Sequence, residues 1–324
     1  MTYVDQRDIG ASDLTVSVVG VGCNAFGSRI DAGRTQSVVD AAIDSGITLF
    51  DTADSYGTGA SEELLGAALG TRRKDVIVAT KFGMAMQETN GPENARASKA
   101  YMRRAVESSL RRLGTDYIDL YQLHTPDRVT PIAETLGAMS ELVDEGLVRY
   151  IGCSNLTAWE LVEADWTAQT SGAQTFVSAQ NEYSLYNRTA EIELVPACGH
   201  LGVGILPYFP LAYGLLTGKY RRGQSAPAGS RLAAQSQRLE SADWDRIEAL
   251  ETYASERGLS ILAVAIGGLA AQPGVASVIA GATRPEQIRS NVEAASWQPT
   301  PADLAALAEI GKPAQSYTTF APRN

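Results

Sequence analysis

Residues 47–57 read ITLFDTADSYG, and this stretch decides the fold. Its first four residues are β-branched or apolar and predict a short buried strand. Asp51 follows that strand directly, and Tyr56 comes shortly after it. A strand that ends in chemically active side chains is typical of a (β/α) barrel, in which active sites form at the carboxyl ends of the strands.

Two more apolar runs end in the same way. Residues 76–80 (VIVAT) precede Lys81, and residues 117–123 (YIDLYQL) precede His124. An acid, a phenol, a lysine and a histidine at one end of a barrel indicate proton transfer to a substrate and not metal capture.

Strand-like and helix-like segments alternate along the chain. Such alternation, with strands apolar on both faces, predicts a parallel sheet, and eight units favour closure into a (β/α)8 TIM barrel. The expected strands are residues 16–20, 47–51, 76–80, 117–123, 149–152, 176–180, 203–208 and 277–281. The expected helices are residues 32–45, 61–69, 98–113, 131–145, 158–164, 189–200, 242–257 and 261–271. A turn at residues 10–12 predicts an N-terminal β-hairpin that plugs the barrel.

Composition limits the function classes. The chain of 324 residues is 44% hydrophobic and 20% charged, and no linker divides it, so one domain over residues 1–324 is expected. A net charge of -10 without a basic run argues against nucleic acid and anionic membrane as partners. Three scattered cysteines form neither a disulfide framework nor a metal-binding spacing, and the amino terminus lacks signal-peptide features. A cytoplasmic protein is therefore expected.

Three segments are longer than a barrel needs: residues 82–97, 209–240 and 312–324. Because long connections are usually functional, we expect them at the catalytic face, as walls of a mainly apolar substrate pocket. The expected lining residues are Phe26, Phe82, Met84, Met86, Tyr213 and Tyr317.

The motifs, taken in order, resemble those of the aldo-keto reductase family, in its bacterial and channel β-subunit-like branch. The resemblance rests on LFDTADSYG at 49–57, ATK at 79–81, DLYQLH at 119–124, GCSN at 152–155, QN at 180–181, PLAYGLLTGKY at 210–220 and GATRPEQI at 281–288. Each fragment alone is weak, but the ordered set is specific. It implies NADPH-dependent reduction of a small-molecule aldehyde or ketone to an alcohol.

The roles that this resemblance implies agree with side-chain chemistry. Tyr56 is the expected general acid, and a nearby cation has to favour its anion because a phenol has a pKa near ~10. Lys81 suits that role, with Asp51 holding it charged, and His124 would hydrogen-bond the substrate carbonyl. Taken singly, the four have ordinary explanations as a cap, loop packing, a solvated charge and a structural histidine.

The family also implies the cofactor contacts. Ser154, Asn155 and Gln180 are expected at the nicotinamide amide, although the first two could simply cap the next helix. Tyr208 is expected to stack on the nicotinamide ring. The full expected set is Gly22, Cys23, Ser154, Asn155, Gln180, Tyr208, Leu211, Gly214, Leu216, Gly218, Lys219, Gly281, Thr283, Arg284, Gln287 and Asn291.

One departure concerns the choice of cofactor. The aldose-reductase branch has a lysine and an arginine where this chain has Gly281 and Gln287. We expect Arg284 to replace them as the guanidinium partner of a 2′-phosphate, with Arg289 as the second candidate, so NADP(H) is favoured over NAD(H). Both arginines could instead be solvated helix charges. The remaining nearby acids, Asp54 and Asp127, are expected in solvent or capping roles.

Two other functional classes stay open. The chain could be an NADP-binding regulatory or auxiliary subunit with slow or vestigial reductase activity. It could also be a barrel lyase or aldolase with Lys81 as a Schiff-base nucleophile. The sequence does not name the substrate, the reaction direction or the oligomeric state.

Overall fold

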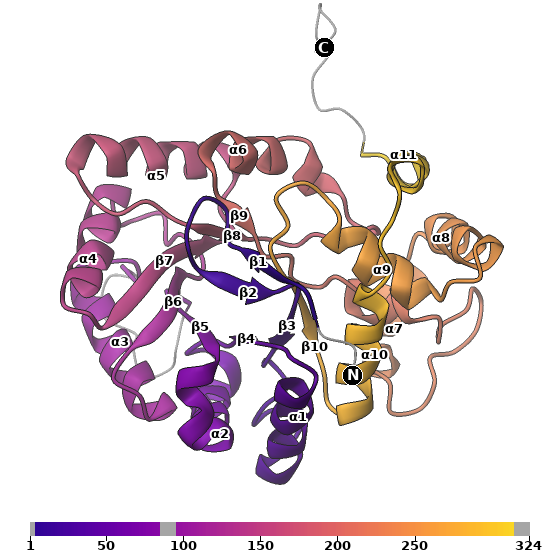
Figure 1. Cartoon of the computed structure of the whole chain (residues 1–324), viewed down its shortest axis with the longest axis horizontal. Helices are drawn as coiled ribbons and strands as arrows, with labels where there is room; N and C mark the ends of the chain where they lie inside the picture. The colour runs from indigo at the N-terminus through magenta and orange to yellow at the C-terminus, as the bar shows by residue number, and fades with distance from the viewer. Residues whose placement is uncertain (1–3, 85–94, 314–324) are drawn as a thin grey trace, which may run out of the picture.

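The barrel is formed by one parallel sheet. The computed structural model describes residues 4–84 and 95–313. Eight strands there pair in the order β10-β3-β4-β5-β6-β7-β8-β9. Helices surround these strands (Figure 1). The strands are β3 Val19–Gly22, β4 Leu49–Asp51, β5 Ile77–Phe82, β6 Ile118–Leu123, β7 Val148–Ser154, β8 Ser178–Gln180, β9 Gly204–Ile205 and β10 Val278–Gly281.

Backbone hydrogen bonds join the two strands at the ends of this order. The Ile205 amide donates to the Gly274 carbonyl at 2.8 Å, and the Ile205 carbonyl accepts from Ala276 at 2.9 Å. Further along, the Ile279 amide donates to the Pro207 carbonyl at 3.1 Å. These bonds close the ring, and the predicted (β/α) barrel is confirmed.

An antiparallel hairpin precedes the barrel, as the turn at residues 10–12 predicts. Its strands are β1 Gln6–Asp8 and β2 Thr15–Ser17. The bounds expected for the first barrel strand, residues 16–20, were wrong, because the first of these residues belong to β2 and the barrel strand begins at Val19.

The hairpin fills the amino-terminal end of the barrel. Ile9, Leu14 and Val16 pack with Leu49, at the start of β4, in one buried cluster. Gly10 has a φ of +59°, and a Cβ there would lie 2.2 Å from the Gly202 carbonyl oxygen. Only glycine allows this approach, so the hairpin turn is seated directly on the barrel wall.

The helices follow the predicted pattern, with additions outside the expected ranges. Their bounds are α1 Ala32–Asp44, α2 Ala60–Leu69, α3 Lys99–Leu113, α4 Ile132–Asp144, α5 Ala158–Ser171, α6 Leu194–Leu201, α7 Ser236–Glu240, α8 Trp244–Glu256, α9 Ile261–Ala270, α10 Pro285–Ala295 and α11 Pro301–Glu309. Helix α11 was not expected. Its signal was present, because Thr300 and Asp303 form a capping box with Pro301 in the first turn.

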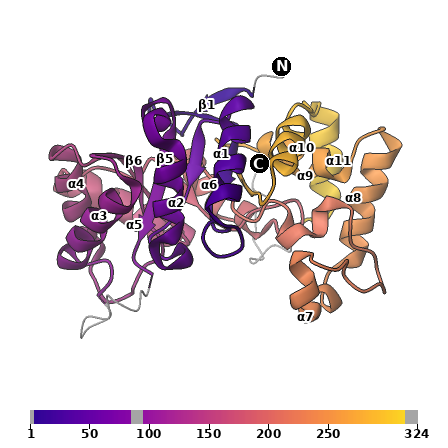
Figure 2. The same ribbon diagram turned by 90° about the horizontal axis from the view of Figure 1, so that it is seen from below.

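The segment 209–240 emerges at the end of the barrel opposite the hairpin (Figure 2), whereas most of 82–97 and 312–324 lies outside the described residues. Figure 2 shows β1 at one end and α7, which belongs to the segment 209–240, at the other. Register places the carboxyl ends of neighbouring strands side by side, with Gly22 opposite Asp51 and Ser154 opposite Gln180. The polar residues at the strand ends are therefore brought to one face.

Candidate active site

Lys81 and Asp51 form an ion pair inside the barrel. The Lys81 side chain is 0% exposed, and its Nζ lies 2.7 Å from Asp51 Oδ2. Nζ also donates to the Thr52 carbonyl oxygen at 2.7 Å. Burial by itself would lower the pKa of Lys81, but Asp51 and Tyr56 outweigh it, and the pKa is raised. Lys81 therefore stays protonated at neutral pH.

Two glutamine amides complete the shell of Asp51. Gln180 Nε2 donates to Asp51 Oδ1 at 2.8 Å, and Gln122 Nε2 lies 3.3 Å from the same oxygen. Gln122 was not predicted as a site residue. Because the amide nitrogen of Gln180 is engaged by Asp51, its carbonyl oxygen is the group left for a contact with a nicotinamide amide.

Tyr56 stands beside the lysine, in a short 3-10 turn that follows β4. Lys81 Nζ is 5.1 Å from the centre of the phenol ring, and the His124 ring meets it edge-on at 5.9 Å between centroids. Burial raises the pKa of Tyr56 above its ordinary value, while Lys81 acts in the opposite direction. The lysine favours the phenolate as expected, but burial is the larger effect.

His124 is a neutral histidine. Its residue is 7% exposed, and burial, followed by the charge of Lys81, lowers its pKa to about 3. Its Nδ1 is buried without a hydrogen-bond partner among the described residues. A neutral imidazole has one donor and one acceptor nitrogen. His124 can therefore hydrogen-bond a substrate oxygen without acting as the acid.

A chain of hydrogen bonds fixes the neighbouring strand end. Tyr208 OH donates to Asn155 Oδ1 at 2.8 Å, and Asn155 Nδ2 donates to the His124 carbonyl oxygen at 2.9 Å. Asn155 has a φ of +60°, in a region where asparagine is enriched. The following helix α5 is capped by Thr157. The simpler explanation of Ser154 and Asn155 as helix caps was therefore wrong.

The site opens into a cavity of about 1230 Å³. Asp51, Tyr56 and His124 line it, and Lys81 lies buried behind them. The predicted cofactor residues that line it are Gly22, Ser154, Asn155, Gln180, Tyr208, Leu211, Gly214, Lys219, Gly281, Thr283, Arg284 and Gln287. The predicted residues Cys23, Leu216, Gly218 and Asn291 are not among its lining residues.

The predicted substrate pocket divides into three groups. Met84 and Tyr213 line the cavity. Phe26 and Phe82 do not, because both side chains are buried in the core, where Phe82 stacks on Tyr121 at 4.8 Å. Met86 and Tyr317 lie outside the described residues.

The segment after β9 carries backbone strain at the cavity wall. Phe209, Ala212 and Tyr213 have φ values of +54°, +45° and +60°. Non-glycine residues avoid this region, and such strain clusters at ligand clamps and active sites. The rings of Phe209 and Tyr213 lie 4.2 Å apart, so the strained turn also presents an aromatic face.

Three arginines at the cavity, Arg29, Arg34 and Arg231, were missed from the sequence. Arg29 and Arg231 line it, and no ion pair within residues 4–84 or 95–313 involves either of them. Burial lowers the pKa of both, and the nearby Arg29 lowers that of Arg231 further. Arg29 lies in a turn and Arg231 in the short 3-10 helix Arg231–Ala234, where no hydrophobic periodicity could have singled them out.

Asp54 corrects another expectation. It is only 2% exposed and therefore neither solvated nor a surface cap. Burial, and then the neighbouring Glu62, raise its pKa to about 7, while Arg112 acts in the opposite direction. Asp127 behaves as expected, because its carboxylate accepts from the amides of Val129 and Thr130.

Three further features of the described residues concern metal ligands, membrane spans and cysteines. No three histidine, cysteine, aspartate or glutamate side chains in them come close enough to hold a metal ion. No helix in residues 4–84 or 95–313 combines the length and apolar character needed to cross a bilayer. Cys23, Cys153 and Cys198 are buried and free.

The fold and the cavity define a (β/α) barrel with a buried ion pair, a phenol and a histidine at its carboxyl end. Residues 18–312 match the Aldo/keto reductase family, and the chain belongs to that family. It is 36% identical over 299 residues to a "Probable voltage-gated potassium channel subunit beta" of Oryza sativa subsp. japonica, covering 89% of this chain and 90% of that protein. It is 37% identical over 295 residues to the "Uncharacterized oxidoreductase YrpG" of Bacillus subtilis (strain 168), covering 88% and 89%.

Proposed function

We propose that this oxidoreductase reduces aldehydes or ketones to alcohols with NADPH. Family membership and the oxidoreductase relatives support the reaction class. One observation carries the proposal: the Tyr56 ring lies 5.1 Å from a fully buried, ion-paired lysine and faces a neutral histidine in the same cavity. A three-way arrangement of this kind suits proton delivery to an oxygen atom.

Each side chain has a separate task in the proposed reaction. Bound NADPH would supply the hydride, which no side chain can provide. Tyr56 donates the proton to the substrate oxygen, and the charge of Lys81 stabilises the phenolate that remains. His124, being neutral, hydrogen-bonds the same oxygen and orients the carbonyl. Asp51 keeps Lys81 charged and holds it in place.

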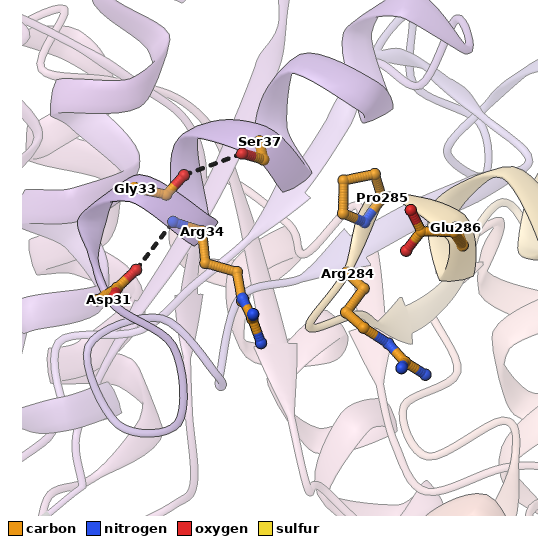
Figure 3. Close-up of a pocket in the computed structure, with 7 residues that line it drawn as sticks. All are labelled: Asp31, Gly33, Arg34, Ser37, Arg284, Pro285 and Glu286. Carbon is orange, nitrogen blue, oxygen red and sulfur yellow. Dashed lines mark hydrogen bonds between the residues drawn. The ribbon is translucent and has the colours of Figure 1, made fainter.

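The cavity fits a dinucleotide with a small substrate. Its volume of about 1230 Å³ exceeds the ~300–1000 Å³ of ordinary small-molecule pockets. At its far end, α10 begins after Arg284 without a side-chain cap (Figure 3). Pro285 has no N–H and the Gln287 amide donates to the Arg284 carbonyl at 3.1 Å, so the Glu286 amide is the first-turn donor that could reach a phosphate. Met84 and Tyr213 would contact the substrate. The predicted cofactor residues that line the cavity would contact the cofactor.

The lyase alternative is disfavoured by the state of Lys81. A Schiff base requires a neutral, accessible amine. Lys81 Nζ is buried and bonded to Asp51 and Thr52, and its pKa is raised. We therefore assign the lysine an electrostatic role.

An auxiliary-subunit function is the second candidate. It is favoured by relatives in rice and in Arabidopsis thaliana, both named "Probable voltage-gated potassium channel subunit beta", the latter 34% identical over 299 residues. In that function the same cavity would hold NADP(H), and turnover would be slow. A cytoplasmic location belongs to either proposal, since three free cysteines suit a reducing compartment.

A carbonyl screen tests the two candidates. Aldehydes, ketones and sugars are supplied to the purified protein while NADPH absorbance is followed, with Tyr56→Phe as the matched control. We expect substrate-dependent oxidation that the control lacks. Tight NADPH binding without turnover on any carbonyl would favour the auxiliary function, and a protein that binds no NADPH would refute both.

A further inference from the structure

The segment that carries Tyr56 is closed at its base by two hydroxyl groups, both 0% exposed. Thr52 Oγ1 lies 2.8 Å from Ser61 Oγ, and Ser61 Oγ donates to the Cys23 carbonyl oxygen at 2.9 Å. Because the single hydroxyl proton of Ser61 is used in the second bond, Thr52 is the donor in the first. Residues 53–60 therefore form a loop, with Tyr56 near its middle, whose two ends are joined to each other and to the end of β3.

This loop needs an external restraint, because its backbone is strained just after Tyr56. Residues 57–59 have φ values of +58°, +56° and +94°. The middle one, Thr58, is β-branched, and β-branched residues are true outliers in this region. Such a conformation persists only where the surrounding structure holds it. The loop's own hydrogen bonds are long, at 3.2 Å from the Tyr56 amide to Ala53 and 3.3 Å from the Thr58 amide to Ser55, so the hydroxyl pair is the tighter restraint.

Thr52 also connects the loop to Lys81. Its carbonyl oxygen accepts from Lys81 Nζ at 2.7 Å, and its amide donates to the Ala79 carbonyl oxygen at 2.8 Å. One residue thus holds the lysine through its backbone and the loop of Tyr56 through its side chain. The distance of 5.1 Å between Lys81 Nζ and the centre of the Tyr56 ring depends on both contacts.

We propose that Thr52 and Ser61 are positioning residues for Tyr56, whose paired hydroxyls hold the phenol beside Lys81 and His124 in the geometry that proton transfer requires. This inference rests on the proposed function, which assigns the acid to Tyr56 without saying what holds it. Neither Thr52 nor Ser61 is among the residues that line the large cavity, so both act through Tyr56. Rates are sensitive to such placement, because an error of ~1 Å in a reacting group can cost about 10²-fold.

Removal of the Thr52 hydroxyl tests the inference. Thr52→Val keeps the shape of the side chain and loses the donor. With the carbonyl compound that the wild-type protein reduces fastest, we expect kcat to fall by roughly 10- to 100-fold, while NADPH affinity changes by less than about 2-fold. Thr52→Ser, which restores the hydroxyl, should recover most of the loss. Equal losses in the valine and serine variants would show that the hydroxyl is not the group that matters.

Thr135→Val is the matched control. Thr135 is another buried threonine, and its hydroxyl donates to the Ala97 carbonyl oxygen at 3.1 Å without lining the large cavity. Both valine variants lose one buried hydrogen bond, so both should have a lower thermal midpoint, but only Thr52→Val should lose turnover. A similar loss of turnover in the two would indicate general destabilisation and overturn the inference.

A double-mutant cycle asks whether the two hydroxyls act as one unit. Ser61→Ala alone should lower kcat in the same range as Thr52→Val. Because each substitution breaks the same contact, the combined variant should lose little more than the larger single loss. Losses that multiply would mean that the two hydroxyls act separately, against the inference.

Hydrogen exchange gives a measurement that does not depend on catalysis. We expect the amides of residues 53–60 to exchange roughly 10-fold faster or more in Thr52→Val and Ser61→Ala, and at the wild-type rate in Thr135→Val. Unchanged exchange in the first two variants would overturn the inference whatever their activity. A wild-type protein that reduces no carbonyl removes the proposed function, and exchange then still decides whether the two hydroxyls hold the loop.

Discussion

The two ends of the large cavity are built in opposite ways. At the Tyr56 end, the charges of Lys81 and Asp51 are buried and bonded to each other. At the other end, Arg34 and Arg284 are exposed and have no ion pair among the described residues. The first end has its charges balanced within the protein, whereas we expect the second to obtain its counter-charge from a bound anion. We therefore expect changes at the first end to affect turnover and folding, and changes at the second to affect affinity.

The largest effect is expected for Tyr56→Phe. Removing the phenol oxygen removes the proton donor, and turnover should fall by about 10²- to 10⁴-fold. NADPH affinity should survive, because the phenol has no cofactor role in this proposal. Steady-state kinetics and a fluorescence titration measure the two quantities separately. Near-normal reductase activity in this variant would end the general-acid assignment.

Lys81→Met should cost about 10²- to 10³-fold in turnover and raise the pKa of Tyr56, because the cation that favours the phenolate is lost. The variant should also be destabilised, since Asp51 is left buried without its partner. A pH profile of the remaining activity and thermal unfolding measure these effects. Mass spectrometry of the wild-type protein after borohydride treatment with a substrate should show no adduct; a reduced Schiff base on Lys81 would instead support the lyase.

Arg284→Ala tests the exposed end of the large cavity. A charge-assisted contact contributes about 1.5–3 kcal/mol, so NADPH affinity should fall by roughly 10- to 150-fold. NADH affinity should change little. Fluorescence titration with both cofactors checks this, and equal weakening of the two would mean that the arginine is only a solvated helix charge.

The smallest effect is expected for Asp54→Asn, and it depends on pH. The pKa of Asp54 is raised from 3.8 to about 7, so the folded protein favours the protonated acid. Wild-type stability is therefore lost as pH rises from about 4 through about 7, whereas asparagine has no proton to lose. The thermal midpoint of the variant relative to wild type should rise by a few degrees, roughly 5 °C, between pH 5 and pH 8. A constant difference across that range would contradict the raised pKa.

The sequence predicted the elements that repeat and the residues at their ends. Short apolar strands followed by polar groups were sufficient to place Asp51, Tyr56 and His124 at one cavity. The direction in which a side chain points was harder to predict from the sequence, although it could have been predicted for Phe82. Lys81 and Phe82 are neighbours in β5, and successive strand residues face opposite sides. A lysine that points to the interior therefore excludes Phe82 from the pocket.

Residues that depend on long-range packing could not be predicted. The pKa of Asp54 is raised by burial and by Glu62, which helix α2 places nearby, and nothing in the local sequence specifies that arrangement. Arg34 and Arg284 line the same cavity because α1 and α10 pack together in the closed ring (Figure 3). Such pairs join residues that are far apart in the chain, and hydrophobic periodicity carries no information about which distant residues come together.

The N-terminal hairpin affects the route by which Tyr56 would regain its proton. Ile9, Leu14 and Val16 fill the amino-terminal end of the barrel with apolar side chains, and Lys81 is completely buried above them. Solvent protons therefore reach Tyr56 from the mouth of the cavity. While ligands fill that mouth, a phenolate produced by one reduction has no solvent from which to recover its proton. In the proposed reaction, departure of the product therefore both empties the cavity and lets solvent return the proton to Tyr56.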